Sequence, residues 1–478
     1  MRRDAPDDAT DAMGVDHTAR LHPPGVVRRI AAELERHGHE TWCGGGAVRD
    51  ALLGIQHLDW DLATAATPQE VRRIFRRTVP VGIEFGTVGV LDEHGQLHEV
   101  TTFRRDVRTD GRHAEVEFGA SLDEDLARRD LTINAIAYSP SRRVLHDPFG
   151  GRDDLARRIV RAVGDPEARM REDRLRALRA IRFAARFGFD IEPVTWTAIV
   201  ASAPFLGRLS AERVKQELDK TAEQVERSGA ALGLWRDAGA LRTLVPAIGD
   251  LSDETIAALD ALPRARGRRG AERRVVWFAT LLGDVPARDL APLLKGLRFS
   301  NVEGRAVTRL VELWQALGDE IGGVLAIGAP DDATVRRWVS RAGRTDVGAF
   351  LRVAAARWCA RRAAGRPAPA PSAVRRLHRR ALAAAWRDPV SLADLAVGGD
   401  ELRGAGIRPG PRMARILHGL LDAVLEDPSR NRVDFLLERA RELAGDAEES
   451  GAVERGRHER GRHERGQDER GQNEREER

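Results

Sequence analysis

The chain has 478 residues, which excludes one ordinary core because domains commonly contain roughly 100 to 200 residues. It carries 78 Lys and Arg against 74 Asp and Glu, and 42% of it is hydrophobic, which excludes a wholly disordered chain. Two cysteines, Cys43 and Cys359, exclude a disulfide scaffold and a multi-cysteine zinc site. No secretory signal and no run of about 18 apolar residues is present. We therefore expect a cytoplasmic protein without membrane spans.

The pattern of the sequence changes once along the chain. Between residues 24 and 150, two helical stretches alternate with short strand-like runs. The helical stretches are Gly25–His37 and Pro68–Arg77, and the strand-like runs are His57–Ala63, Thr87–Asp92 and Gln96–Phe103. From about residue 151 the pattern is almost wholly helical. Residues 1–22 and 447–478 are polar, the latter with an Arg/Glu/Gly repeat, and we expect both ends to be disordered.

Three glycines, residues 44–46, follow an apolar run that ends at Cys43. A helix is predicted to begin at about Ala47. Glycines at such a turn let backbone N–H groups converge on an anion, so Gly45 and Gly46 are candidate phosphate ligands. A tight turn without a ligand is the alternative. Arg49 favours phosphate binding because an arginine in the first helical turn can reach the same anion.

Two aspartates, Asp59 and Asp61, alternate with apolar residues in the first strand-like run. In a strand they would share one face, with Cα atoms about 7 Å apart. Paired carboxylates of this kind suit Mg²⁺. Glu99 is the candidate third carboxylate of a two-metal site, with Glu115 and Glu117 as rivals. The alternative is an exposed strand face without a metal.

Two further clusters combine arginine with Asp or Asn. Arg129, Asp130 and Asn134 lie at the start of an apolar, helix-like stretch and can face one site, where they suit a triphosphate and ribose hydroxyls. The alternative is that Asp130 caps a helix and Asn134 is buried and satisfied within the protein. In the predicted helix 170–189, four polar residues recur every three positions: Asp173, Arg176, Arg179 and Arg182. They could extend from a base pocket toward phosphates, or form a solvated face.

Four motifs, GGGAVRD, DWD, RRDLTINAIAY and EDRLRALRAIRFAARFGF, occur in this order. Over roughly residues 24–220 the chain thereby resembles the class II tRNA nucleotidyltransferases, the CCA-adding enzymes. That family shares its head with bacterial poly(A) polymerases and, more distantly, with polymerase β. The resemblance implies an α+β fold, in which a small nucleotidyltransferase head with a mixed sheet precedes a long all-α part. The implied segments are a head (23–150), a neck (151–220), a body (221–365) and a tail (366–446).

The resemblance also implies roles for individual residues. Gly46 and Arg49 would contact the triphosphate, and Asp59 and Asp61 would bind Mg²⁺. Glu99 matches the third carboxylate of the family. The remaining implied roles belong to the other two motifs: Arg129 and Asp130 for phosphate and ribose, Asp173 and Arg176 for the base, and Arg179 and Arg182 as support of the pocket.

The base-reading role agrees with hydrogen-bond polarity. Cytosine and adenine both present an amino donor beside a ring-nitrogen acceptor, whereas uracil and guanine present a carbonyl beside an N–H. Asp173 as acceptor and Arg176 as donor would therefore select C and A, since each mispaired buried group costs about 1 to 3 kcal/mol. The change from C to A is not explained by these residues. The resemblance implies that the growing RNA end and a flexible loop change the pocket from C to A. The stretch Arg104–Arg112 resembles that loop.

Residues 398–432 resemble the tail segment of the family, which is expected to rest on the elbow of tRNA. This favours tRNA over poly(A) as the product, whereas a helical hairpin for packing or dimerisation is the alternative. We expect an Mg²⁺-dependent enzyme that builds or repairs the CCA end of tRNA from CTP and ATP and releases pyrophosphate. The remaining alternatives are a poly(A) polymerase, a CC-adding or A-adding enzyme, and a non-catalytic RNA-binding protein.

Overall fold

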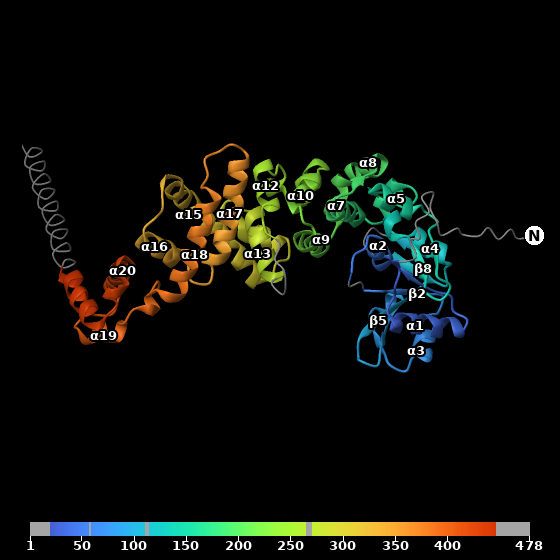
Figure 1. Ribbon diagram of the computed structural model, residues 1–478, viewed down its shortest axis with the longest axis horizontal. Helices are drawn as coiled ribbons and strands as arrows, with labels where there is room; N and C mark the ends of the chain where they lie inside the picture. Colours follow the sequence, from blue (N-terminus) through green and yellow to red (C-terminus); the bar gives the residue numbers. More distant parts are fainter. Residues whose placement is uncertain (1–19, 57–58, 110–113, 264–269, 446–478) are drawn as a thin grey trace, which may run out of the picture. The chain divides into compact units, whose positions relative to one another are not determined.

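The structure is a computed structural model that describes residues 20–56, 59–109, 114–263 and 270–445. The chain forms two compact units that divide between Arg305 and Ala306. Within the described residues, all strands belong to the first unit (Figure 1), and the second unit is helical. Most of the two polar ends, for which we predicted disorder, lies outside the described residues. The finer division into head, neck, body and tail stays a prediction.

The described part of the first unit contains a seven-stranded sheet in the order β3-β4-β5-β2-β1-β8-β9. Its strands are β1 (Thr41–Gly44), β2 (Leu62–Thr64), β3 (Thr78–Pro80), β4 (Thr87–Leu91), β5 (Leu97–Thr102), β8 (Ala137–Ser139) and β9 (Val144–His146). Only the β2–β5 pair is parallel, and the other neighbours are antiparallel. The sheet is therefore mixed, which confirms the predicted fold class.

The helices of the sheet region are α1 (Gly25–Arg36), α2 (Gly46–Leu52), α3 (Pro68–Ile74) and α4 (Leu122–Ala127). Helix α1 agrees with the prediction within one residue. Helix α3 ends three residues earlier than predicted, because Phe75 adopts an extended backbone before β3 begins at Thr78. A separate two-stranded hairpin is formed by β6 (Arg104–Thr109) and β7 (Ala114–Phe118). It includes most of the stretch that resembles a flexible loop, whose residues 110–112 lie outside the described residues.

Two predicted elements differ in the structure. The strand predicted over His57–Ala63 begins only at Leu62, where pairing with both Cys43 and Val100 starts, so Asp59 and Asp61 lie in the segment before β2. His57 and Leu58 are outside the described residues. Arg129 and Asp130 do not begin an α-helix. The next residues form a bridge from Leu131 to Ala162 and one 3-10 turn, Thr132–Asn134, because the backbone pairs with residues 161–162 instead.

The rest of the first unit is mainly helical, as predicted. Its elements are α5 (Gly151–Arg157), β10 (Ile159–Val160), α6 (Pro166–Glu172), α7 (Leu175–Phe187), β11 (Asp190–Ile191), α8 (Pro193–Ser202), α9 (Ala211–Gln224), α10 (Ser228–Asp237), α11 (Ala240–Leu244), α12 (Asp253–Asp260), α13 (Gly270–Leu281) and α14 (Ala287–Gly296). The single helix predicted over 170–189 is two helices. It breaks at Asp173, whose backbone is extended and whose carboxylate accepts a hydrogen bond from the Leu175 N–H.

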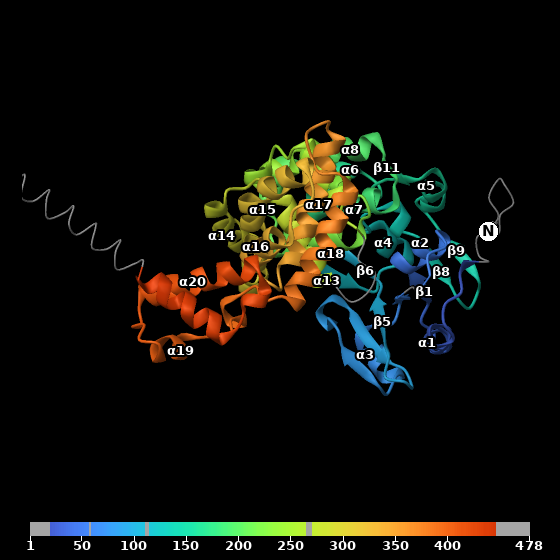
Figure 2. The same ribbon diagram turned by 60° about the vertical axis from the view of Figure 1, so that its left-hand side comes forward.

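The second unit begins within α15 (Asn301–Ile327). It continues with α16 (Asp332–Ala342), α17 (Val347–Ala363), α18 (Pro371–Arg387), α19 (Gly399–Gly404), α20 (Pro411–Glu426) and a helix over 433–445. Helix α18 packs against both α16 and α17 (Figure 2). No described helix is both long and apolar enough to cross a membrane.

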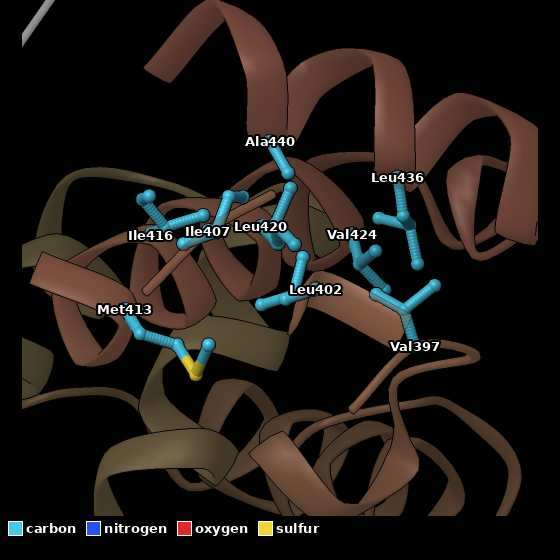
Figure 3. Packing of buried hydrophobic residues seen from close by; sticks show 9 residues of the cluster. All are labelled: Val397, Leu402, Ile407, Met413, Ile416, Leu420, Val424, Leu436 and Ala440. Carbon is cyan, nitrogen blue, oxygen red and sulfur yellow. The ribbon is translucent and has the colours of Figure 1, made fainter. Parts of the chain in front are cut away.

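A small apolar core closes the last part of the second unit (Figure 3). It unites side chains from α19, α20, the helix over 433–445 and the segments before and between them: Val397, Leu402, Ile407, Met413, Ile416, Leu420, Val424, Leu436 and Ala440. Helix α20 ends at Glu426, before Asp427 and Pro428. This helix lies within residues 398–432, the segment that resembles the tail of the family.

Candidate active site

The glycine turn joins β1 to α2, as the sequence predicts. Gly45 has a φ of 69°, a conformation that a residue with a side chain adopts at a cost. The Arg129 guanidinium lies over this turn: a Cβ atom added to Gly45 would be 3.2 Å from its Nη1 atom. The same addition at Gly44 would come within 3.8 Å of Nη2. The turn therefore places backbone N–H groups beside a cation.

A buried carboxylate, which the sequence analysis missed, anchors Arg129. Asp125 accepts hydrogen bonds from Nη2 of Arg129 at 3.0 Å and from Arg128 at 2.9 Å. Burial by itself raises the pKa of Asp125, but the two guanidinium groups lower it by more than that. The pKa of this carboxyl therefore lies below its usual range. The i,i+4 spacing of Asp125 and Arg129 was the available signal. The buried Nε of Arg129 has no hydrogen-bond partner among the described residues.

The predicted carboxylates lie at two central strands of the sheet, with Asp59 and Asp61 just before β2 and Glu99 within β5. Because β2 and β5 pair in parallel with Leu62 opposite Val100, Asp61 and Glu99 directly precede two paired residues. Burial, and after it the charges of Glu99 and Asp59, raise the pKa of Asp61 to about 6 against the opposing charge of Arg129. These interactions bring the three predicted carboxylates and Arg129 into one electrostatic group.

One rival of Glu99 has another partner. Glu117 accepts hydrogen bonds from Arg105 across the β6–β7 hairpin, at 2.8 and 3.0 Å. The side chain of Glu115 is outside what the structure describes. Glu99 therefore remains the best candidate for the third carboxylate.

The set of Asp59, Asp61 and Glu99 fits a divalent cation that is also bound by phosphate. Mutual repulsion of acidic groups, as at Asp61, is relieved by a cation, and oxygen atoms are the ligands of Mg²⁺. Among the described residues, however, no three His, Cys, Asp or Glu side chains are gathered closely enough to hold a metal ion alone. Mg²⁺ commonly keeps water molecules and substrate phosphates among its ligands. The donor set therefore suits a metal that enters with a nucleotide.

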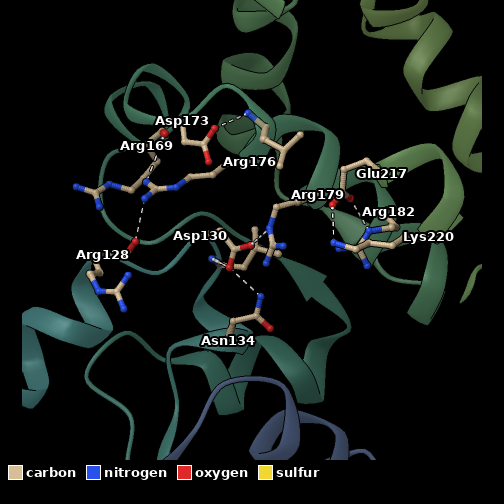
Figure 4. A network of polar contacts seen from close by, with 12 residues as sticks. Arg128, Asp130, Asn134, Arg169, Asp173, Arg176, Arg179, Arg182, Glu217 and Lys220 are labelled. Carbon is tan, nitrogen blue, oxygen red and sulfur yellow. Dashed lines mark hydrogen bonds and ion pairs between the residues drawn. The ribbon is translucent and has the colours of Figure 1, made fainter. Parts of the chain in front are cut away.

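Buried hydrogen bonds connect Asp130 to Arg179 and to Asn134 (Figure 4). The Oδ2 atom of Asp130 accepts a hydrogen bond from Nε of Arg179 at 2.7 Å, and Oδ1 accepts one from the amide of Asn134 at 2.8 Å. Asn134 in turn accepts a hydrogen bond from Arg49. Burial raises the pKa of Asp130, but Arg179 and Asn134 lower it more, so it stays below its usual value. Asn134 is thus buried and hydrogen-bonded within the protein, as expected if it does not bind a nucleotide.

Arg49 lies beneath the turn rather than open to it. Its side chain is 4% exposed, its Nε donates to Asp50 at 2.6 Å, and its guanidinium lies 4.8 Å from the ring centre of Phe183 and 4.9 Å from that of Phe187. Burial lowers the pKa of Arg49, against the opposing charge of Asp50. With Asn134 also bound, Arg49 is placed to support the site more than to approach a phosphate directly.

Asp173 and Arg176 lie at the break between α6 and α7 (Figure 4). The Oδ2 atom of Asp173 accepts a hydrogen bond from Arg213 at 2.7 Å. Arg176 donates to Glu172 at 2.6 Å and to the backbone carbonyl of Arg128 at 2.9 Å. These contacts connect α7 to α9 and to the loop that carries Arg129.

The alternative of a solvated arginine face is wrong for Arg176 and Arg182, which are 8% and 3% exposed. Nε of Arg182 donates to Glu217 at 2.6 Å, and Glu217 is itself only 1% exposed. Glu217 and Arg213 are partners that the sequence analysis missed. They lie on α9, and no local pattern links them to α7.

A glycine turn under a guanidinium, beside carboxylates at the central strands of a mixed sheet, defines the head of a nucleotidyltransferase. Comparison with known families agrees. Residues 41–161 match the family model of the poly A polymerase head domain. Residues 188–251 match the model described as the probable RNA and SrmB-binding site of polymerase A.

Individual relatives narrow the family. The chain is 35% identical over 432 residues to the CCA-adding enzyme of Limosilactobacillus fermentum, which covers 87% of this chain and 96% of the relative. It is 47% identical over 193 residues to the CCA-adding enzyme of Geobacillus stearothermophilus, a match that covers 40% of this chain and 47% of the relative. The solved Bacillus stearothermophilus CCA-adding enzyme in complex with CTP matches with a TM-score of 0.68 and 33% identity, over 88% and 98% of the chains. The chain belongs to the family of CCA-adding enzymes.

Proposed function

We propose that the protein adds or repairs the 3′-terminal CCA of tRNA, using CTP and ATP and releasing pyrophosphate, without a nucleic acid template. One observation carries the proposal: the Arg129 guanidinium lies over the Gly45 turn and shares an electrostatic group with Asp61 and Glu99. This arrangement supports the proposal, because nucleotidyl transfer requires a cationic site for phosphate next to carboxylates that can bind a metal. The two free thiols suit the cytoplasm, where we place the reaction.

Arg129 and the backbone of Gly45 and Gly46 would bind the triphosphate of the incoming nucleotide. Asp125 would keep the Arg129 guanidinium in place, since it binds one edge and leaves the buried Nε for an acceptor. Arg49 would act mainly by fixing Asn134. Direct contact of Arg49 with phosphate, and of Asp130 and Asn134 with ribose, stays part of the proposal.

Asp59, Asp61 and Glu99 would hold Mg²⁺ together with the phosphates. When bound, the metal would neutralise phosphate charge and lower the pKa of the attacking 3′ hydroxyl. One of these carboxylates would accept the proton of that hydroxyl as it attacks the α-phosphate. Arg129 would stabilise the charge of the departing pyrophosphate, so catalysis rests mainly on positioning and electrostatics.

Asp173 and Arg176 would read the base. A carboxylate has about four lone-pair sites, and Asp173 uses two of them for Arg213 and the Leu175 N–H. It can therefore also accept from the amino group of cytosine or adenine. Arg179 and Arg182 would support the pocket through Asp130 and Glu217. The segment 398–432 would rest on the elbow of tRNA.

Asp61→Asn tests the proposal. With Mg²⁺ and ATP, the variant should lose addition of A to a tRNA transcript ending in CC, while its affinity for that transcript stays within a few-fold. Glu93→Gln is the matched control, because Glu93 is an exposed carboxylate in the turn between β4 and β5. It should keep full activity. An Asp61→Asn variant as active as the unaltered protein would refute the proposed site.

A further inference from the structure

The open face of the sheet is apolar beyond Glu99. Successive residues of a strand point to opposite faces of a sheet. In β5, His98 and Val100 are buried, whereas Leu97 is 37% exposed and Glu99 is also exposed. Leu97 therefore lies on the same face of the sheet as Glu99, the candidate third carboxylate.

Apolar side chains close over the residue opposite Glu99. Gly89 of β4 pairs with Glu99, and Val79 of β3 pairs with Gly89. A Cβ atom added to Gly89 would lie 2.8 Å from Leu97, 2.8 Å from Val81 and 2.9 Å from Val79. These three side chains therefore meet over Gly89, and we call them the apolar platform. Val81 is 40% exposed, so the platform is open to solvent.

An exposed aromatic residue borders the apolar platform. Phe85 is 52% exposed and lies in the turn between β3 and β4. Just after it, Thr87 pairs with Thr101 of β5. Single exposed apolar residues are common on proteins, whereas contiguous apolar patches rimmed by polar residues mark binding sites for ligands or partners. The platform, next to a candidate metal ligand, fits such a site.

The order of the strands indicates which part of a substrate reaches the platform. The glycine turn follows β1, the carboxylates lie at β2 and β5, and the platform belongs to β5, β4 and β3, in this order across the sheet. In nucleotidyl transfer the attacking and leaving oxygens lie in line, on opposite sides of the phosphorus. If pyrophosphate leaves at the glycine turn, the attacking hydroxyl must approach from the side of β4 and β3.

We propose that the apolar platform (Val79, Val81 and Leu97) holds the base of the last nucleotide of the acceptor RNA, so that its 3′ hydroxyl lies at the carboxylates. The proposal rests on the proposed function for the identity of the acceptor. The last base of the acceptor changes with each addition, and an uncharged surface tolerates this change because every base has a flat face. None of the three residues belongs to the four motifs of the sequence analysis.

Removal of the contact from both sides tests the proposal. Val81→Asn/Leu97→Asn is compared with the unaltered protein in the addition of A to a tRNA transcript ending in CC. On the intact transcript the variant should lose about fivefold or more in kcat/KM, with KM for ATP unchanged. On a transcript whose last nucleotide lacks its base, the two proteins should differ by less than about twofold, because the contact is already absent.

Two matched double variants serve as controls. Val81→Ile/Leu97→Met keeps both side chains apolar and should keep the rate on the intact transcript. Val302→Asn/Val324→Asn changes two exposed apolar side chains of α15 and should keep the rate on both transcripts. Thermal melting within a few degrees of the unaltered protein shows that each variant is folded.

Three results would overturn the proposal: an unchanged rate in the platform Asn variant, an equal fall on both transcripts, or an equal fall in the α15 variant. A fluorescent 2-aminopurine as the last base reports on the same contact without turnover. Its emission should change when the transcript binds the unaltered protein but not when it binds the Asn variant. If the emission changes but no nucleotide is added, the proposed function fails and the platform stands. An emission that never changes overturns the platform, whether or not nucleotides are added.

Discussion

The carboxylate of Asp130 accepts a hydrogen bond from Nε of Arg179 at 2.7 Å, although 49 residues separate them. The pair joins the loop after α4 to helix α7. Through Asn134 it continues to Arg49 beside the glycine turn. The candidate phosphate site and the candidate base-reading helix are thus parts of one buried polar network, so a change at this pair should affect both stability and nucleotide binding.

Asp130→Ala should lower the free energy of unfolding by about 3 kcal/mol at pH 7, because it leaves Arg179 without its partner in a buried network. Urea denaturation measures the change. The double variant Asp130→Ala/Arg179→Leu should lose less than the sum of the two single changes. Strict additivity would show that the pair does not stabilise the fold.

The same pair predicts a pH dependence. The pKa of Asp130 lies below its usual value in the folded protein, so its stabilising effect is present above the unfolded pKa of about 3.9 and is lost as pH falls through the folded pKa. The stability difference between the unaltered protein and Asp130→Asn should therefore shrink as the pH falls below about 4. Urea denaturation at a series of pH values checks this, and a constant difference would contradict it.

Gly45→Ala should impair nucleotide binding in addition to stability. Gly45 has a φ of 69° and a ψ of −134°, a backbone conformation that residues with a side chain rarely adopt, and the added Cβ meets Arg129 at 3.2 Å. Gly38→Ala is the control, since Gly38 has a φ of 86° and nothing lies within 4 Å of its added Cβ. Both changes should reduce stability. Only Gly45→Ala should raise KM for ATP, by about tenfold, or about 1.4 kcal/mol. Equal KM values would separate the turn from phosphate binding.

Asp173→Ala should blur the selection of C and A over U and G more than it weakens tRNA binding. Loss of one buried hydrogen-bond partner corresponds to about 1 to 3 kcal/mol of discrimination. Arg213→Ala is the control, because it removes the ion-pair partner of Asp173 and keeps the carboxylate. Competition between all four NTPs, read from product sequences, measures the effect. An unchanged preference in Asp173→Ala would remove Asp173 from the base pocket.

The two thiols should differ in reactivity. Cys43 is fully buried, and this burial, with the nearby charge of Asp61, raises the pKa of its thiol to about 12. Cys359 is exposed. A thiol reagent at pH 8 should therefore modify one cysteine per native chain and two per unfolded chain. Rapid modification of Cys43 in the native protein would contradict the packing beside the glycine turn.

Local patterns predicted the parts of the site that depend on near neighbours. Glycines before an amphipathic run indicated the turn at Gly45, and strand-like runs indicated that Glu99 would lie beside Asp61. Both follow from the periods of helices and strands. The roles of these residues remain predictions until the variants are measured.

Partners far apart in the chain were not predictable in this way. Arg213 and Glu217 reach α7 from α9, and only tertiary packing brings them there. The break at Asp173 was also missed, because the apolar period continues through it while the Asp173 side chain bonds to the backbone instead. The contacts of Arg49 with Asp50 and Asn134 were not predicted either, and its contact with phosphate stays a prediction.

Product analysis on three tRNA transcripts tests the central claim most directly. One transcript ends at the discriminator base, one in C and one in CC, and each is offered all four NTPs with Mg²⁺ and read at single-nucleotide resolution. The account predicts that all three grow to CCA and then stop. Arrest after CC, addition to the CC transcript alone, an unlimited ladder of A or no addition would contradict it.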